Sequence, residues 1–294
     1  YLLMGAFSSG VVLYGMVLLY GFAGGTGLEA IAKTMGTGSF RNPALIMAIV
    51  LLAAGFGFKI AAVPFHMYLP DMYEGAPTPV VAFMAGAAEL AGMAVLVRVF
   101  LSALPELQLD WALLFWVLAV LTMSIGNLVA IAQANLKRML AYSTIAHMGY
   151  LLIGLVVGSQ LGVAAVLFYS LAYACMTIGA FGMVVLLAHG TVRGDQIDDF
   201  TGLAQRSPLA AGIMLLFLLS LTGIPPTAGF VGKFYLFAAA VDSGYIWLAL
   251  IAVVNSAVSL FYYMRVAMVM YMREMPPQRI VMSQSPALYL ALFL

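Results

Sequence analysis

Long runs of apolar residues, separated by short polar connections, fill the chain from one end to the other. Within each run the apolar residues lie on all sides of a helix rather than along one stripe, which is typical of helices that face lipid. A helix of about 20 such residues crosses a bilayer. The pattern therefore predicts an all-α, polytopic transmembrane helical bundle. The predicted spans are 1–22, 43–61, 79–101, 111–134, 138–157, 160–188, 208–223 with 227–241, 245–272, and a further span that begins near residue 286.

Proline and glycine interrupt this pattern at two places, FKIAAVPFHMYLPDMYEGAPTP at 58–79 and LTGIPPTAGFVGK at 221–233. Proline inside a helix removes a backbone donor and clashes with the preceding turn. In a membrane the carbonyl groups that are freed need protein or water as partners. Paired interruptions of this kind often mark a translocation path, although a simple packing kink is the alternative interpretation. The sequence thus predicts two broken helices.

The composition supports a membrane protein and excludes several kinds of site. Of the 294 residues, 65% are hydrophobic and 8% are charged, whereas a soluble domain has about a quarter of its residues charged. The single cysteine, Cys175, excludes an intrachain disulfide, a CxxC metal site and iron–sulfur ligation by this chain alone. The sequence contains neither a strand followed by a glycine-rich phosphate loop nor a cluster of metal ligands. We expect no cofactor in this chain.

The basic residues of the connections predict the orientation of the bundle, because cytoplasmic loops are rich in Lys and Arg. One predicted side of the bundle carries Lys137, Arg138, Arg193, Arg206, Arg273 and Arg279. The other side carries Lys33, Arg41 and Arg98. The first side is predicted to be cytoplasmic, which places the connections 62–78, 189–207 and 273–285 there.

Two lysines lie inside predicted spans, each beside a break. Lys59 precedes Pro64 and Lys233 follows Pro226. A lysine at the centre of a membrane helix costs about 2.5–3.5 kcal/mol, so such residues usually line a polar path. A lysine that is buried away from water can release and regain a proton near neutral pH, as a proton relay requires. Lys59 could instead extend to the interface, an alternative that is harder for Lys233 because apolar sequence continues to residue 241.

Acidic residues lie in and beside the first broken helix. Glu89 is about halfway along 79–101, where it could pair with Lys59 or carry a proton itself. We expect His66, Asp71 and Glu74 at the cytoplasmic surface, where they structure the connection or collect protons.

A histidine lies in the middle of the predicted span 138–157, in the run AYSTIAHMGY. A single histidine in a helix is often only packed and hydrogen-bonded. Here Ser143, Thr144 and Tyr150 could join His147 in a hydrogen-bonded chain, so a relay is an equal alternative. Lys137 and Arg138 lie at the start of this span, where the simplest role is that of a positive anchor.

The chain begins at Tyr1 within an apolar run and ends at Leu294, nine residues into another. We therefore expect an internal fragment of a longer protein.

Five runs resemble the antiporter-like membrane subunits of respiratory complex I. The run FKIAAVPFHMYLPDMYEGAPTPV is similar to their signature, and the form PDMYEGAPTPV looks like subunit N rather than subunits L or M. The other runs, in family order, are NLKRMLAYSTIAHMGYLLIGL, FYSLAYACMTIGAFG, LSLTGIPPTAGFVGKFYLFAAAV and NSAVSLFYYMRV.

The resemblance implies a fold of fourteen helices with two inverted five-helix repeats. Residues 1–294 would form one proton-translocating domain, from helix six to the start of helix fourteen. In it, 1–101 ends the first repeat, 111–272 forms the second, and 286–294 begins the last helix.

The resemblance also implies roles for single residues. Lys59 would be the central lysine of broken helix seven and Lys233 the lysine of broken helix twelve, on the exit side. Lys137 and His147 would lie on the relay between the halves. The sequence departs from the family at Glu89, where a lysine is usual, and the glutamate partner of the helix-seven lysine would precede Tyr1.

The implied partners are other membrane subunits, protons and the lipid bilayer, and nucleic acid is not expected. NAD, FMN, iron–sulfur clusters and quinone would belong to other subunits of an NADH:quinone oxidoreductase in a bacterial inner membrane. The alternatives are a subunit of a Mrp-type cation/proton antiporter or of a membrane-bound hydrogenase, and an inert structural membrane subunit.

Overall fold

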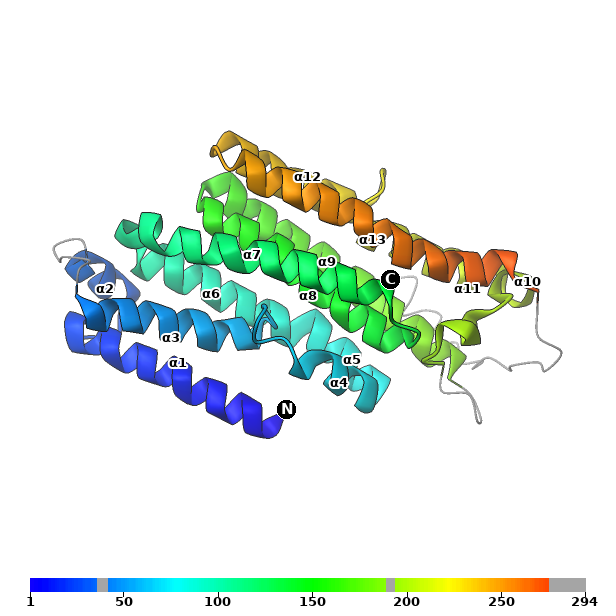
Figure 1. Cartoon of the computed structure of the whole chain (residues 1–294), viewed down its shortest axis with the longest axis horizontal. Coiled ribbons are helices and arrows are strands. Elements are labelled where there is room, and N and C mark those ends of the chain that lie inside the picture. Colours follow the sequence, from blue (N-terminus) through cyan, green and yellow to red (C-terminus); the bar gives the residue numbers. More distant parts are fainter. Residues whose placement is uncertain (36–41, 189–193, 275–294) are drawn as a thin grey trace.

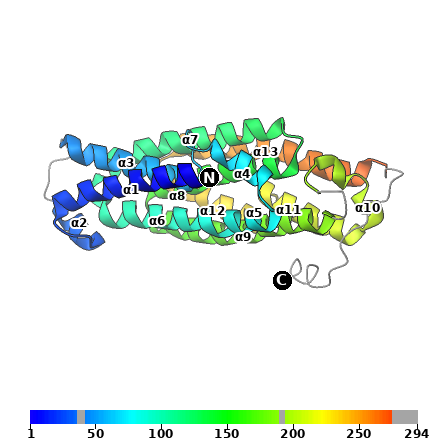
Figure 2. The same ribbon diagram turned by 90° about the horizontal axis from the view of Figure 1, so that it is seen from below.

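The computed structural model describes residues 1–35, 42–188 and 194–274, which form a bundle of helices. The helices run nearly parallel to the long axis of the molecule, with α2 at one end and α10 at the other (Figures 1 and 2). The helices are α1 (Leu2–Ala23), α2 (Leu28–Met35), α3 (Pro43–Lys59), α4 (Tyr68–Gly75), α5 (Thr78–Phe83), η1 (Met84–Ala88), α6 (Glu89–Ala103), η2 (Pro105–Leu107), α7 (Gln108–Ile131), α8 (Leu136–Val157), α9 (Gln160–Leu187), η3 (Ile197–Phe200), α10 (Leu203–Arg206), α11 (Pro208–Thr222), α12 (Ala228–Asp242) and α13 (Ile246–Met272).

The predicted all-α membrane fold is confirmed. Within the described ranges, six helical segments are long and apolar enough to cross a membrane, and α3 and α11 are shorter apolar helices. Each shorter helix is followed by a break and a second helix, α4 or α12, so the two pairs supply the two broken spans. The span expected near residue 286 lies outside the described residues.

The first break differs from the sequence prediction. Residues 62–78 were expected to form a cytoplasmic connection, but α3 ends at Lys59 and Tyr68–Gly75 form α4, which packs beside α8. Figure 1 shows α4 extending beyond the end of α3 toward the end of the bundle that carries α10. The chain therefore continues its crossing after the break, because the prolines interrupt the helix without reversing its direction.

The second break depends on glycine at two positions. Gly223 ends α11 with a φ of +86°, a conformation that side chains other than glycine rarely adopt. At Gly229, in the first turn of α12, a Cβ atom would overlap the main-chain carbonyl of Ser220. The Gly229 N–H donates to the Ser220 hydroxyl at 3.2 Å, and the Thr227 hydroxyl caps α12 by accepting from the N–H of Phe230. Glycine thus lets α12 start directly against the end of α11.

The span between α4 and η2 contains one turn of π-helix. Helices α5 and α6 are joined by η1, Met84–Ala88, and Glu89 follows it directly. A π-helical turn inserts one extra residue into the helical register and is frequent at functional sites. It therefore sets the direction of every side chain that follows, beginning with Glu89.

Helix α8 is the most buried membrane span of the bundle, with 94% of its apolar window inside the protein. It packs against α7, α9, α12 and α4. Because α8 has almost no contact with lipid, the polar side chains along it face other helices. Helix α8 therefore lies at the centre of the candidate site.

Candidate functional site

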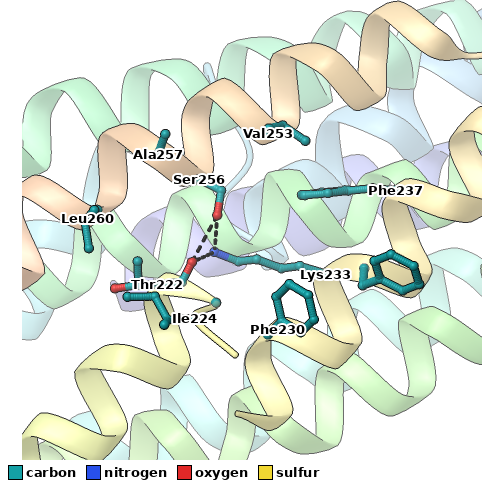
Figure 3. Close-up of a pocket in the computed structure, with 11 residues that line it drawn as sticks. Thr222, Ile224, Phe230, Lys233, Phe237, Val253, Ser256, Ala257 and Leu260 are labelled. Atoms are coloured by element: carbon teal, nitrogen blue, oxygen red, sulfur yellow. Dashed lines mark hydrogen bonds between the residues drawn. The ribbon is translucent and has the colours of Figure 1, made fainter. Parts of the chain in front are cut away.

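The amine of Lys233 lies at the second break and is only 3% exposed. It donates to the carbonyl group of Leu221 at 3.0 Å. It also donates to the carbonyl group of Thr222 at 2.9 Å and to the hydroxyl of Ser256 at 3.1 Å (Figure 3). The two carbonyl groups belong to the last turn of α11, where the partial negative charge of the helix end favours a cation. The break thus provides the partners that a charged lysine needs in the membrane.

A cavity of about 370 Å³ lies beside this lysine, between α11, α12 and α13. Figure 3 shows Lys233 extending across it toward Thr222 and Ser256, with Phe230 and Phe237 on either side. On the inner side, the Lys233 amine lies 4.7 Å from the ring centre of Tyr150 on α8, within the range of a cation–π contact. Lys233 therefore connects the second break to α8.

Behind Tyr150, amide and hydroxyl groups of α7 and α13 form a buried cluster. The Asn127 amide donates to the Tyr150 hydroxyl at 3.2 Å and to the Asn255 side chain at 3.3 Å. In return, the Tyr262 hydroxyl donates to Asn127 at 2.9 Å. The rings of Tyr262 and Tyr263 lie 4.4 Å apart, which carries the cluster on toward the middle of α8.

His147 occupies the middle of α8 and is only 1% exposed. Its Nδ1 atom lies 2.6 Å from the Tyr169 hydroxyl of α9, and its Nε2 atom lies 3.1 Å from the Tyr263 hydroxyl of α13. Tyr263 is in turn hydrogen-bonded to Ser143. Both ring nitrogens therefore face a hydroxyl group that can give or take a proton.

The cluster continues from α8 toward the first broken helix. The Tyr173 hydroxyl donates to Thr144 at 2.7 Å, and its ring centre lies 5.0 Å from that of His147. The Tyr73 hydroxyl of α4 lies near Thr144 and donates to the Glu89 carboxyl group at 2.7 Å. Tyr73 thus links α4, α6 and α8.

Glu89 is only 3% exposed, and the sequence alone did not determine its partner. Its second carboxyl oxygen, Oε2, is buried without a hydrogen-bond partner in the described part of the protein. Of the two alternatives for Glu89, an ion pair with Lys59 is not found among the described residues. The π-helical turn before Glu89 directs it toward Tyr73 instead.

Lys59 is half-buried at the end of α3, and its amine donates to the Ser9 hydroxyl of α1 at 3.1 Å. Its side chain therefore points toward α1, whereas its backbone lies against Gly92 of α6. The structure brings Lys59 to the first break, as expected, but not into hydrogen-bond contact with Glu89.

Lys137 is 5% exposed and lies in the first turn of α8. Its amine donates to the carbonyl groups of Glu74 at 3.1 Å and Ala76 at 2.8 Å, at the end of α4. The neighbouring Arg138 forms ion pairs with Asp71 at 2.7 Å and with Glu74 at 2.9 Å. Both basic residues thus hold α4 against α8, rather than acting only as a positive anchor.

The surface position expected for three residues of the first break is only partly correct. The side chains of Asp71 and Glu74 are largely exposed, but His66 is 7% exposed and its Nδ1 atom lacks a hydrogen-bond partner among the described residues. His66 lies in the break itself, where Pro64 and Met67 are exposed but the His66 side chain is turned into the bundle. The prediction for His66 is therefore wrong.

We call this set the polar axis. Hydrogen bonds join most neighbouring members, whereas ring contacts join Tyr173 to His147 and Tyr262 to Tyr263, and a cation–π contact joins Tyr150 to Lys233. It runs through the bundle from the first broken helix to the second. Its members are Glu89, Tyr73, Thr144, Tyr173, His147, Tyr169, Tyr263, Ser143, Tyr262, Asn127, Tyr150 and Lys233.

Sequence reasoning did not single out most tyrosines of the polar axis. Tyr169 and Tyr173 are four residues apart in an apolar run, so they share one face of α9. Tyr262 and Tyr263 are adjacent and both fully buried. These tyrosines could have been identified from the sequence by their hydroxyl groups, because a tyrosine hydroxyl needs a hydrogen-bond partner when it is buried in a membrane protein.

No three His, Cys, Asp or Glu side chains of the described residues are grouped so that they could hold a metal ion. The expectation about cofactors stays a prediction.

The sequence and fold are similar to those of known membrane subunits. Residues 1–259 match the family model for NADH:quinone oxidoreductase/Mrp antiporter, transmembrane. The NADH-quinone oxidoreductase subunit N of Trichlorobacter lovleyi is 50% identical over 274 residues, which are 93% of this chain and 56% of that protein. The chain thus spans less than two thirds of the length of this relative.

Two solved structures have the same fold. A chain of respiratory complex I from Thermus thermophilus has a TM-score of 0.82 and 36% identity, over 99% of this chain and 62% of that one. A chain of the Mrp complex from Dietzia has a TM-score of 0.86 and 26% identity, over 96% of this chain and 52% of that one. The family model, which covers most of the sequence, shows that the chain belongs to the NADH:quinone oxidoreductase/Mrp antiporter transmembrane family.

Proposed function

We propose that this chain is part of subunit N of an NADH:quinone oxidoreductase and carries protons along the polar axis. The observation that supports this most strongly is the axis itself, which joins Glu89 beside the first break to Lys233 at the second. Burying charged or polar groups in a membrane protein is unfavourable, and such groups usually mark ion pathways.

The groups of the polar axis have the chemistry that proton transfer requires. Hydroxyl and imidazole groups both donate and accept hydrogen bonds. When Tyr169 gives its hydroxyl proton to Nδ1 of His147, Nε2 can release a proton to Tyr263, over the 2.6 Å and 3.1 Å contacts. Tyr263 then passes its own hydroxyl proton to Ser143, and Tyr169 takes up a new proton to complete the cycle. At the ends, Glu89 and Lys233 can each hold a proton, and Oε2 of Glu89 is open to receive one. The ends would thus store protons and the middle would pass them on.

The energy for transport would come from outside this chain. Moving one charge across 100 mV requires about 2.3 kcal/mol. We expect NAD, FMN, iron–sulfur clusters and quinone in other subunits, and conformational or electrostatic coupling to Lys59 and Lys137 at the first broken helix. In this scheme 1–101 ends one repeat and 111–272 forms the next.

A cation/proton antiporter subunit is the second candidate, because the Dietzia Mrp chain has the higher TM-score of the two structures compared. The 50% identity to a subunit N favours the first candidate. Transport that depends on sodium would favour the second.

The test uses the full-length protein in the assembled enzyme, in inverted membrane vesicles. Lys233→Ala and Lys59→Ala should each reduce proton pumping and the coupled quinone reductase activity. Lys33→Ala, an exposed lysine of α2, is the control and should leave both unchanged. Undiminished pumping by a well-assembled Lys233→Ala enzyme would contradict the proposal.

A further inference from the structure

A groove lies between α6 and α9 on the outside of the bundle, away from the polar axis. The two spans pack closely at one point, where a Cβ atom on Gly86 would come within 2.6 Å of Ile178. Farther along they diverge and leave a cavity of about 300 Å³, a size at the lower end of the range for ligand pockets. The cavity is lined by Leu90, Ala94, Val97, Arg98, Leu101, Ser102, Val163, Val166, Leu167 and Ser170.

The lining is formed by two facing helical stripes. On α6, Leu90, Ala94, Arg98 and Ser102 are four residues apart, so they lie on one face. On α9 the lining residues follow the same kind of spacing and are mostly aliphatic. The groove is therefore an apolar channel along the helices with a single charged group near one end.

That charged group, Arg98, has no partner in the described part of the protein. It is exposed, it forms none of the ion pairs found there, and no hydrogen bond to it is observed. It lies five residues before Ala103, where α6 ends, at the end of the bundle opposite to Arg138. A charged side chain inside a membrane segment almost always pairs with another group. Because no side chain of the described residues supplies that group, the guanidinium group of Arg98 is available to an anion from outside them.

We propose that this groove binds an anionic phospholipid, with its phosphate group on Arg98 and one acyl chain between α6 and α9. A guanidinium group binds a phosphate through parallel hydrogen bonds, and basic positions between membrane helices attract anionic headgroups. The distance of Arg98 from the helix end corresponds to about one and a half turns, so the side chain can reach the headgroup level while the apolar stripe extends inward. The Ser102 hydroxyl lies on the headgroup side of the same stripe.

The test places a photoreactive benzoylphenylalanine at Leu167, an exposed groove residue, in the full-length protein within the assembled complex. The complex is reconstituted in vesicles of equal parts phosphatidylglycerol and phosphatidylcholine and irradiated, and the adducts are identified by mass spectrometry. We expect phosphatidylglycerol to be the main adduct. Removal of one cation near a membrane surface is worth about 1 kcal/mol, so Arg98→Gln should lower this adduct about fivefold.

Two further variants separate the parts of the proposal. Ala94→Phe fills the groove but keeps the charge, and it should also lower the phosphatidylglycerol adduct. Lys33→Gln removes an exposed cation from the same end of the bundle and should leave the adduct unchanged. An adduct to a protein subunit, equal labelling of both lipids, or an adduct unaffected by Arg98→Gln would overturn the proposal.

Discussion

Among single residues, Glu89 and Lys233 differ in how fully their polar atoms are bonded. All three protons of a charged Lys233 amine have acceptors, in two carbonyl groups and one hydroxyl group. Glu89 has one hydrogen-bonded oxygen, and its Oε2 atom has no hydrogen-bond partner among the described residues. The structure thus supplies partners for the charged form of Lys233 and leaves one oxygen of Glu89 available to accept a proton.

The role of Glu89 can be tested with its amide isostere. In Glu89→Gln, the side-chain oxygen still accepts from Tyr73, but the side chain no longer binds and releases a proton. Loss of a general acid–base group slows proton transfer by about 100-fold or more, so pumping through this subunit should nearly stop. Proton uptake by vesicles, divided by the quinone reductase rate, measures this effect.

Glu106→Gln is the matched control, because Glu106 is exposed outside the polar axis. If Glu89→Gln pumped as well as this control, Glu89 would have only a structural role as the acceptor for Tyr73.

At the scale of the elements, the two broken helices are stabilised in different ways. The end of α11 is held by the Lys233 amine and by the close approach of α12 at Gly229. The end of α4 is held by Lys137 and Arg138 from α8. Exposed ion pairs such as those of Arg138 contribute little, about 0–1 kcal/mol, so the buried Lys137 contacts matter more for the position of α4.

The second break should be sensitive to a single methyl group. Gly229→Ala places a Cβ atom against the Ser220 carbonyl, and overpacking of this kind costs about 1–3 kcal/mol or more. We expect the melting temperature of the purified, assembled protein to fall by on the order of 5 °C, with reduced pumping. Thermal unfolding in detergent measures the change.

Gly212→Ala is the control within α11, because a Cβ atom there meets nothing within 4 Å. Alanine favours the helix over glycine by about 0.5–1 kcal/mol, so this variant should be as stable as the wild type or more so. Equal melting temperatures for the two variants would show that α12 does not depend on the close approach at Gly229.

At the scale of the whole molecule, sequence reasoning predicted the spans and both breaks but not how they connect. The apolar runs are long enough to define helices, and proline with glycine marks the interruptions, since both signals are local. The direction of the chain after Pro64 could not be predicted from the local sequence, because it depends on how α4 packs against α8. For the same reason His66 was expected at the surface, although the bundle encloses it.

The site was predicted in part, and its missing members have a common cause. The buried charged residues stand out because charge is rare in a membrane span. Tyrosine is common in such spans, so Tyr73, Tyr169 and Tyr263 became visible only when the packing showed which hydroxyl groups meet. The sequence left open whether Glu89 pairs with Lys59, because the answer depends on the π-helical turn before Glu89 and on the direction of Lys59 toward Ser9.

We propose that protons pass between the two broken helices through His147, so the decisive measurement is the number of protons pumped per electron. The assembled enzyme with full-length His147→Phe is compared with wild type and with Tyr142→Phe, a change on the same helix at a hydroxyl group for which no hydrogen bond is observed within the described ranges. We expect a lower ratio for His147→Phe, because phenylalanine neither binds nor passes a proton between Tyr169 and Tyr263, and a wild-type ratio for Tyr142→Phe. A wild-type ratio in a fully assembled His147→Phe enzyme would show that protons do not pass through His147.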